Sequence, residues 1–463
     1  MEQVLPYLES NRERYLAELK EFLAIPSVSS LSEHVKDMQR CAEWISAQMK
    51  KVGMENIQIL PTGGHPLVYS DWLHAAGRPT VLFYGHYDVQ PVDPLELWTT
   101  PPFEATVRGE NLYARGAADD KGQVMIHLKA IEALMQKHRA LPVNVKMIIE
   151  GEEEIGSDNL DRFVEEHRDL LEADLVVISD SGMYAKGVPS ICYSLRGLSY
   201  MEVEVTGPNR DLHSGSFGGS VHNPVQVLCE MIASLHDKNG KITVKGFYDD
   251  VRSLTKAERD SFKKLPFSDR QYAKDLGVKQ LYGEKGFTTL ERLWSRPTLE
   301  CNGIWGGYTG EGAKTVLPAK ASAKISMRLV PDQSSEKAAK LFEKHFKKIA
   351  PPTVQVKVRN LHGGEAAITP IDSPGVKTAV AALEKGFGKK VLYQGEGGSI
   401  PIVAQFKKIL GIDTVLLGFG LPDENAHSPN EFINLGNFFG GIRTSAYFYN
   451  LLPDFWQAKG KKH

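Results

Sequence analysis

Cysteine is scarce in this sequence. The 463 residues include four cysteines, at Cys41, Cys192, Cys229 and Cys301. No two of them are spaced as CxxC, so the sequence indicates neither a disulfide framework nor a zinc knot. We therefore expect four buried or idle thiols in a reducing, cytoplasmic environment.

Long hydrophobic runs and an excess of one charge are also missing. No stretch reaches the roughly 18 to 20 apolar residues that span a bilayer. Residues 1–26 lack the apolar run of a signal peptide, and we expect an amphipathic helix there. The 55 basic and 57 acidic residues give a formal net charge of −2. Because no large field of one sign results, we expect neither nucleic acid nor an anionic membrane as a partner.

The chain is too long for a single hydrophobic core of ordinary size. Two kinds of predicted strand occur in different parts of the sequence. Continuous apolar runs are typical of strands buried on both faces of an α/β layer, and they lie at 81–85, 147–149, 175–179 and 414–420. Apolar residues at helical spacing predict helices between them, over roughly 35–52 and 121–138.

The second style alternates apolar and polar residues, which predicts a sheet with one covered and one wet face. It occurs at 199–207, 321–330 and 353–358. In the first of these segments we expect Tyr200 and the valines on one face, opposite the serine, methionine and glutamates. The α/β pattern stops near 195 and resumes near 370, which predicts an inserted domain. Residues 240–300 are charged and suggest lid elaboration, with one helix expected near 255–265.

Polar residues stand where buried strands are predicted to end, which is where α/β sheets commonly form their sites. In GHYDV (85–89), the side chains of His86 and Asp88 are expected on the same face of a strand, because the two residues are two positions apart. They could be a metal ligand and the carboxylate that orients it, or simply a hydrogen-bonded pair. In RGAADDKGQ (115–123), Asp119 and Asp120 precede a helix. Only one of the two can cap that helix, and the other is free for a cation.

Three consecutive glutamates at 152–154 follow another buried strand, where their repulsion calls for a cation, although a solvated loop is the alternative. Asp180 and His427 follow two further strands, and each alone would be an ordinary turn or loop residue. Together, two histidines and several carboxylates suit Zn²⁺ or a similar cation, and there are enough carboxylates for two ions. The residues alone do not single out one of the three glutamates as a general base.

The motifs GHYDV, RGAADDKG, GEEEIGS, ISD and NAHSPNE resemble, in order and spacing, those of the M20 family of dizinc peptidases and deacylases. The resemblance covers essentially the whole chain. It implies an α/β fold: a three-layer α/β/α catalytic domain at 1–195 and 368–463, interrupted by an α+β lid and dimerisation domain at 196–367.

The resemblance also implies a role for each polar residue. Two divalent cations, Zn²⁺ first, with Mn²⁺ or Co²⁺ as alternatives, would share five ligands: His86, Asp119, Glu154, Asp180 and His427. Asp119 would bridge both ions, and Asp88 would orient His86. Glu153 would be the general base that takes a proton from water and delivers it to the departing amine. Asp120 is no ligand in this pattern, and the peptide bond between Asp119 and Asp120 is expected to be cis.

Further contacts are implied for the inserted domain. The segment at 207–224 resembles a lid motif whose histidine, here His213, reaches across a dimer interface into the partner's site; read without the resemblance, His213 is a surface or turn residue. Four residues are implied as substrate contacts: Thr315, Arg328, His362 and Ser399. The guanidinium fork of Arg328 suits the C-terminal carboxylate of a peptide.

The expected protein is thus a cytoplasmic, homodimeric metallodipeptidase that cleaves dipeptides or short peptides with a free C-terminus. The long lid favours the dipeptidase branch of the family. An N-acyl-amino-acid deacylase or a glutamate-releasing carboxypeptidase would use the same chemistry on another substrate. A catalytically idle metal-binding scaffold is the alternative from another class.

Overall fold

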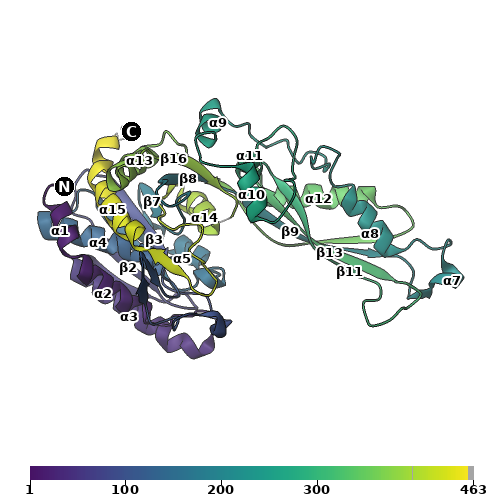
Figure 1. Cartoon of the computed structure of the whole chain (residues 1–463), viewed down its shortest axis with the longest axis horizontal. Coiled ribbons are helices and arrows are strands. Elements are labelled where there is room, and N and C mark those ends of the chain that lie inside the picture. Colours follow the sequence, from purple (N-terminus) through teal and green to yellow (C-terminus); the bar gives the residue numbers. More distant parts are fainter. Residues whose placement is uncertain (399, 457–463) are drawn as a thin grey trace. The chain divides into compact units, whose positions relative to one another are not determined.

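The chain forms two compact units in a computed structural model that describes residues 1–398 and 400–456. Unit 1 comprises Met1–Tyr193, Thr369–Gln394 and the chain from Gln405 onward, and unit 2 comprises Ser194–Ile368 and Gly395–Ala404 (Figure 1). The chain therefore leaves unit 1 and returns to it. Gly395–Ala404, which the sequence prediction placed in the first domain, clusters with unit 2. The assignment of the two units as catalytic and lid domains stays a prediction.

A mixed sheet forms the centre of unit 1. Its strands follow the order β1 (Glu55–Leu60), β2 (Leu67–Trp72), β6 (Asn144–Glu150), β3 (Thr80–His86), β7 (Leu175–Ile178), β17 (Thr414–Leu416) and β8 (Ser190–Leu195). The four strands from β6 to β17 run parallel to one another, and the others are antiparallel to their neighbours. At the edge, β15 (Ala367–Ile368) and β16 (Leu392–Glu396) pair with β8. A small second sheet has the order β18 (Phe432–Asn434), β5 (Asn111–Tyr113) and β4 (Thr106–Arg108).

Both faces of the central sheet are covered, which explains the continuous apolar runs. On β3, Phe83 stacks on His127 of α4 (Lys121–His138), with ring centroids 4.1 Å apart. Its neighbour Tyr84 points to the opposite face and meets Phe406 of α14 (Pro401–Leu410), with centroids 5.6 Å apart. The other helices of unit 1 are α1 (Val4–Ser10), α2 (Arg12–Leu23), α3 (Val35–Val52), α5 (Leu160–Glu166), α6 (Arg168–Leu171), α13 (Pro374–Phe387) and α15 (Leu435–Phe455). Helix, sheet and helix thus make three layers, as expected.

Unit 2 is built on an antiparallel sheet with the order β11 (Thr298–Gly306), β13 (Lys320–Leu329), β9 (Gly197–Thr206) and β14 (Gln355–Gly364). Buried and half-buried residues alternate along β9. Helices α8 (Pro224–Ala233) and α12 (Ser335–Ile349) cover one face, where Val203 and Ile325 join the apolar core. The remaining elements are β10 (Leu212–His213), β12 (Val316–Leu317), α7 (Ser214–Phe217), α9 (Lys256–Phe262), α10 (Asp269–Asp275) and α11 (Thr289–Trp294).

The structure confirms α3 and α4 with the predicted bounds and corrects four local predictions. The expected N-terminal helix is two helices that meet at Asn11. The strand expected over 414–420 ends at Leu416. On β9, Met201 is buried with the valines, whereas Tyr200 is on the other face, because residues that share a face are two positions apart. Between 240 and 300 the chain forms three short helices rather than one.

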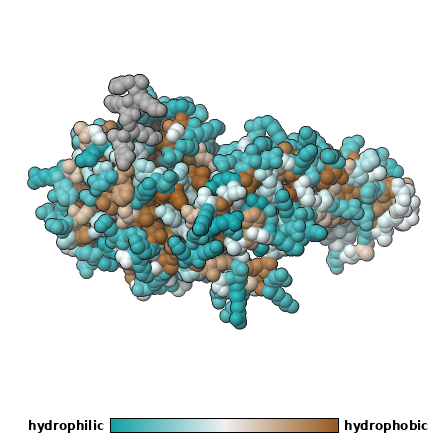
Figure 2. Space-filling view, turned by 90° about the horizontal axis from the view of Figure 1, so that it is seen from above, coloured by the Kyte–Doolittle hydropathy of each residue, from teal (hydrophilic) through white to brown (hydrophobic). Residues whose placement is uncertain are grey.

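Neither the surface nor the cysteines point to a further function in the part of the chain that the structure describes. No helix there combines the length and the apolarity needed to cross a membrane. On the face shown in Figure 2, hydrophobic residues are interspersed with hydrophilic ones. All four cysteines are free thiols; Cys41 and Cys192 are buried, whereas Cys229 and Cys301 are exposed.

Candidate metal centre

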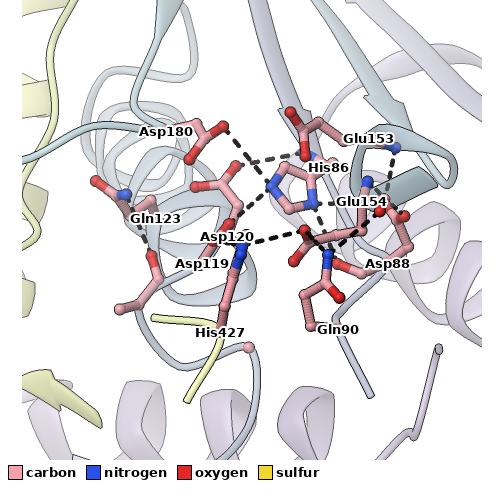
Figure 3. A network of polar contacts seen from close by, with 12 residues as sticks. His86, Asp88, Gln90, Asp119, Asp120, Gln123, Glu153, Glu154, Asp180 and His427 are labelled. Atoms are coloured by element: carbon pink, nitrogen blue, oxygen red, sulfur yellow. Dashed lines mark hydrogen bonds and ion pairs between the residues drawn. The ribbon is translucent and has the colours of Figure 1, made fainter. Parts of the chain in front are cut away.

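The parallel strands of unit 1 deliver polar side chains to one edge of the sheet. The strand β3 ends at His86, β6 ends just before the glutamates at 152–154, and β7 ends two residues before Asp180. Asp119 precedes α4, whose N-cap is Asp120. Because the carboxyl ends of parallel strands meet at the same edge, these side chains converge (Figure 3).

One group of potential metal ligands consists of His86, Asp119 and Asp180, whose donor atoms all lie within 4.8 Å of one another. Nε2 of His86 is 3.0 Å from Oδ1 of Asp119 and 3.9 Å from Oδ2 of Asp180. On the other side of the ring, Nδ1 lies 3.1 Å from the carbonyl oxygen of Asp88 and 3.4 Å from its carboxylate. Nδ1–H can therefore donate to Asp88, which leaves the lone pair of Nε2 for a cation.

A second group consists of Asp119, Glu154 and His427. Nε2 of His427 lies 2.9 Å from Oδ2 of Asp119 and 3.1 Å from Oε2 of Glu154. Asp119 therefore belongs to both groups and presents a different carboxylate oxygen to each histidine. A shared carboxylate of this kind can bridge two cations.

The charges of the cluster fit divalent cations. Burial and the neighbouring Asp119 raise the pKa of Asp180 well above its ordinary value. Hydrogen bonds with Asp119 and Glu154 raise the pKa of His427 to about 10, so that a proton takes the place of a cation in the metal-free protein. Imidazole nitrogens with carboxylate oxygens form a donor set that Zn²⁺ and similar cations accept. Asp120 belongs to neither group, although its Oδ2 accepts a hydrogen bond from the backbone N–H of His86 at 3.3 Å.

The structure separates the three glutamates that the sequence left equivalent. Glu152 turns away from both groups, and its carboxylate accepts hydrogen bonds from Thr62 (3.2 Å) and Asn159 (3.1 Å). Glu154 joins the second group. Glu153 is a member of neither group but stands beside them (Figure 3), and burial raises its pKa to about 7.

Asp88 and Gln90 hold the segment of Glu153 and Glu154 in place. The carboxylate of Asp88 accepts hydrogen bonds from the backbone N–H groups of Glu153 (3.2 Å) and Glu154 (3.0 Å), so that Asp88 contacts both the histidine and the glutamate segments. Gln90, which the sequence reading missed, donates from Nε2 to Oε2 of Glu154 at 2.8 Å. No strand period marked it, because β3 ends at His86 and Gln90 lies in the segment that follows.

Four further predicted residues, His213, Thr315, Arg328 and His362, belong to unit 2. His213 ends β10 and caps α7, and its Nδ1 accepts hydrogen bonds from the backbone N–H groups of Gly215 (3.0 Å) and Ser216 (3.2 Å). Thr315 is exposed, and its carbonyl oxygen accepts a hydrogen bond from the N–H of Ser214 at 3.0 Å. Pairing between β10 and β12 thus brings His213 and Thr315 into one exposed corner.

Arg328 and His362 lie on the two strands that flank β9. Arg328 pairs with Leu198, and His362 pairs with Tyr200, on whose ring it stacks at a centroid distance of 5.1 Å. Both therefore belong to the face of the sheet opposite the apolar core. Ser399 lies outside the described residues.

The chain is similar in sequence to known proteins. Residues 82–450 match the profile of "Peptidase family M20/M25/M40". The chain is 35% identical over 457 residues to the Cys-Gly metallodipeptidase DUG1 of Candida albicans, covering 94% of each chain. It is 32% identical to the Beta-Ala-His dipeptidase of Homo sapiens, covering 97% of this chain and 92% of that one.

Solved structures show the same fold. The M20 family metallo-carboxypeptidase Sso-CP2 from Sulfolobus solfataricus is 37% identical, with a TM-score of 0.81 and coverage of 95% of this chain and 99% of that one. Human carnosine dipeptidase 1 is 32% identical, with a TM-score of 0.77 and coverage of 98% of both chains. These likenesses confirm the expected fold class and the family resemblance.

Proposed function

This chain belongs to peptidase family M20/M25/M40, and from that premise we propose that it hydrolyses dipeptides, or similar short peptides with a free C-terminus, with two divalent cations. The observation that carries the proposal is the position of Asp119, whose two carboxylate oxygens contact the histidines of two donor groups. Relatives that span nearly the whole chain are named for Cys-Gly and Beta-Ala-His dipeptidase activity.

The proposed ligands follow from the two groups. His86 and Asp180 would hold one cation, Glu154 and His427 the other, and Asp119 would bridge them. Zn²⁺ is the first candidate, with Mn²⁺ or Co²⁺ as alternatives, because all three accept this donor set. When bound, the cations supply Lewis acidity that polarises the scissile carbonyl and makes water a stronger acid.

Glu153 is the proposed general base. A carboxyl whose pKa is raised to about 7 by burial can take a proton near neutral pH and return it to the departing amine. Asp88 holds the backbone of Glu153 in place through the N–H at 3.2 Å. A catalytically idle metal-binding scaffold would not require Glu153, a buried carboxylate that stands beside both donor groups without belonging to either.

Unit 2 would recognise the substrate and act as the lid and dimerisation domain of a cytoplasmic homodimer. Arg328 would pair with the substrate's C-terminal carboxylate, and Thr315, His362 and Ser399 would contribute further contacts. His213 would stabilise the anionic oxygen of the reaction in the partner's site. Its tautomer supports this role: because Nδ1 accepts two backbone N–H groups, the ring hydrogen is on Nε2 and can be donated.

The test is a substrate panel on protein freed of metal and reloaded with Zn²⁺, Mn²⁺ or Co²⁺. We expect the metal-free protein to be inactive and the reloaded protein to cleave unblocked dipeptides. Turnover of N-acyl amino acids alone would replace the dipeptidase proposal by a deacylase. Release of C-terminal residues from longer peptides in preference to dipeptides would favour a carboxypeptidase, which the likeness to Sso-CP2 makes the second candidate. Full activity after verified metal removal would reject the metal proposal itself.

A further inference from the structure

Glu431 is a buried carboxylate that lies four residues after His427, with 1% of its surface exposed. Each of its oxygens accepts two hydrogen bonds. Oε2 accepts from Nη1 of Arg115 (2.8 Å) and from the backbone N–H of Gly116 (2.9 Å). Oε1 accepts from the backbone N–H groups of Ala118 (2.9 Å) and Asp119 (3.1 Å). One side chain therefore binds most of the segment that leads into Asp119.

This arrangement is more than a charge pair. Burial raises the pKa of Glu431, and the guanidinium of Arg115 opposes that shift. The buried guanidinium of Arg115 alone would balance the charge of Glu431, yet three backbone N–H groups of one short segment also donate to the carboxylate. Such a set of donors fixes the path of a backbone rather than the position of one side chain.

The same carboxylate joins two parts of the candidate site that are far apart in the sequence. His427 lies on the loop whose last residue is Glu431. Asp119 lies on the segment whose backbone N–H groups donate to the Glu431 carboxylate. The two side chains meet at 2.9 Å. Glu424 closes the other end of this loop, because its carboxylate accepts the N–H groups of Leu421 and Asn434, both at 2.8 Å. The His427 loop is therefore closed at its base by Glu424 and attached to the Asp119 segment by Glu431.

We propose that Glu431 is the positioning residue for the bridging aspartate, so that both cation positions depend on its four hydrogen bonds. The inference rests on the proposed function, because it presupposes that Asp119 is shared by two cations. Glu431 itself touches neither substrate nor cation; it acts through the backbone of Asp119.

The experiment compares Glu431→Gln and Glu431→Asp with the wild-type protein. The amide introduced by Glu431→Gln has the shape of the carboxylate, but in either orientation its NH₂ group faces a pair of donors. The shorter side chain introduced by Glu431→Asp retains the charge but cannot reach all four donors. Dissociation constants for Zn²⁺ and Co²⁺ are measured by competition with a chelator, and the Co²⁺ absorption spectrum reports the ligand geometry. We expect affinity for both cations to fall by about 10- to 100-fold, as for other residues that orient metal ligands.

Glu132→Gln is the matched control. Glu132 is a buried carboxylate of α4 that accepts hydrogen bonds from Tyr7, Arg14 and Lys129, outside both donor groups. Its variant should lower the melting temperature of the metal-free protein without changing cation affinity or the Co²⁺ spectrum. If a folded Glu431 variant binds both cations within twofold of the wild type, the positioning role is wrong. If the wild-type protein itself binds no pair of cations, the proposed function fails, and the two failures are thereby distinguished.

Discussion

The central sheet of unit 1 and the sheet of unit 2 carry their polar residues in different places. In unit 1 the strands β3, β6, β7 and β17 are buried on both faces, so that candidate functional residues stand at the strand ends or beyond them. In unit 2 one face of the sheet is free of the apolar core, and Arg328 and His362 lie within its strands.

The two regions also differ in how firmly they hold their candidate residues. His86 and Asp88 are fully buried, and their partners come from distant parts of the sequence. His213 and His362 are exposed; His213 contacts the backbone of the helix α7 that follows it, and His362 stacks on Tyr200 of the adjacent strand. A buried site can keep charges in one geometry before a substrate arrives, whereas an exposed face can adapt to the shape of different peptides.

The largest expected effect is at Glu153, in the buried site of unit 1. Glu153→Gln should lower kcat by about 10²- to 10⁴-fold, because it removes proton transfer while the five proposed ligands remain. Metal content, measured on the purified variant, should stay at the wild-type value. Near-normal turnover by a fully loaded variant would contradict the role of Glu153 as base.

The next effect concerns His213, in the exposed region. His213→Ala should lower kcat by about 10²- to 10³-fold if its Nε2–H stabilises the anionic oxygen. Because the proposed site is the partner's, mixing this variant with Glu153→Gln should restore partial activity through mixed dimers. Absence of recovery, with subunit exchange demonstrated, would assign His213 to its own subunit or to no catalytic role.

Pairs of neighbouring residues test the difference between the sheets. On β13, Ile325→Ala should lower the free energy of unfolding by about 2 to 5 kcal/mol, whereas the exposed neighbour Lys324→Ala should change it by less than about 0.5 kcal/mol. On β3, where both faces are covered, Val81→Ala and Leu82→Ala should both be costly. Denaturant unfolding measures the free energy of unfolding of all four variants. If either substitution on β3 left this free energy unchanged, the proposed difference between the two sheets would be wrong.

The smallest expected effect is a pH dependence of stability that arises from His127, which is buried between α4 and the central sheet. Burial lowers its pKa to about 3, and the neutral ring accepts from the hydroxyl of Tyr449 (2.9 Å) and donates to Ser179 (2.7 Å). The unfolded chain gains a proton on this ring near its ordinary pKa of 6.5, but the folded chain does not. The stability that His127 contributes is therefore complete above pH 6.5 and falls by about 1.4 kcal/mol per pH unit between pH 6.5 and its folded pKa of about 3.

Comparison with His127→Gln isolates this effect. The difference in unfolding free energy between wild type and variant should shrink as the pH is lowered from 6 to 4, measured by denaturant unfolding at each pH. His138→Gln, at the exposed end of the same helix, is the matched control. A difference that stays constant with pH would show that His127 is not kept neutral by burial.

The sequence by itself determined the elements and the candidates for chemistry. Helices α3 and α4 could be predicted because the spacing of their apolar residues is a local property, and residues beyond buried strands could be singled out for the same reason. Only the tertiary structure decided which carboxylate does what. It turned Glu152 toward Thr62, placed Glu154 beside His427 and left Glu153 beside the two groups as a member of neither. It also placed Glu431 against the backbone of Asp119, 312 residues away in the chain. Such contacts depend on how strands and loops pack in space, and no local period in the sequence records them.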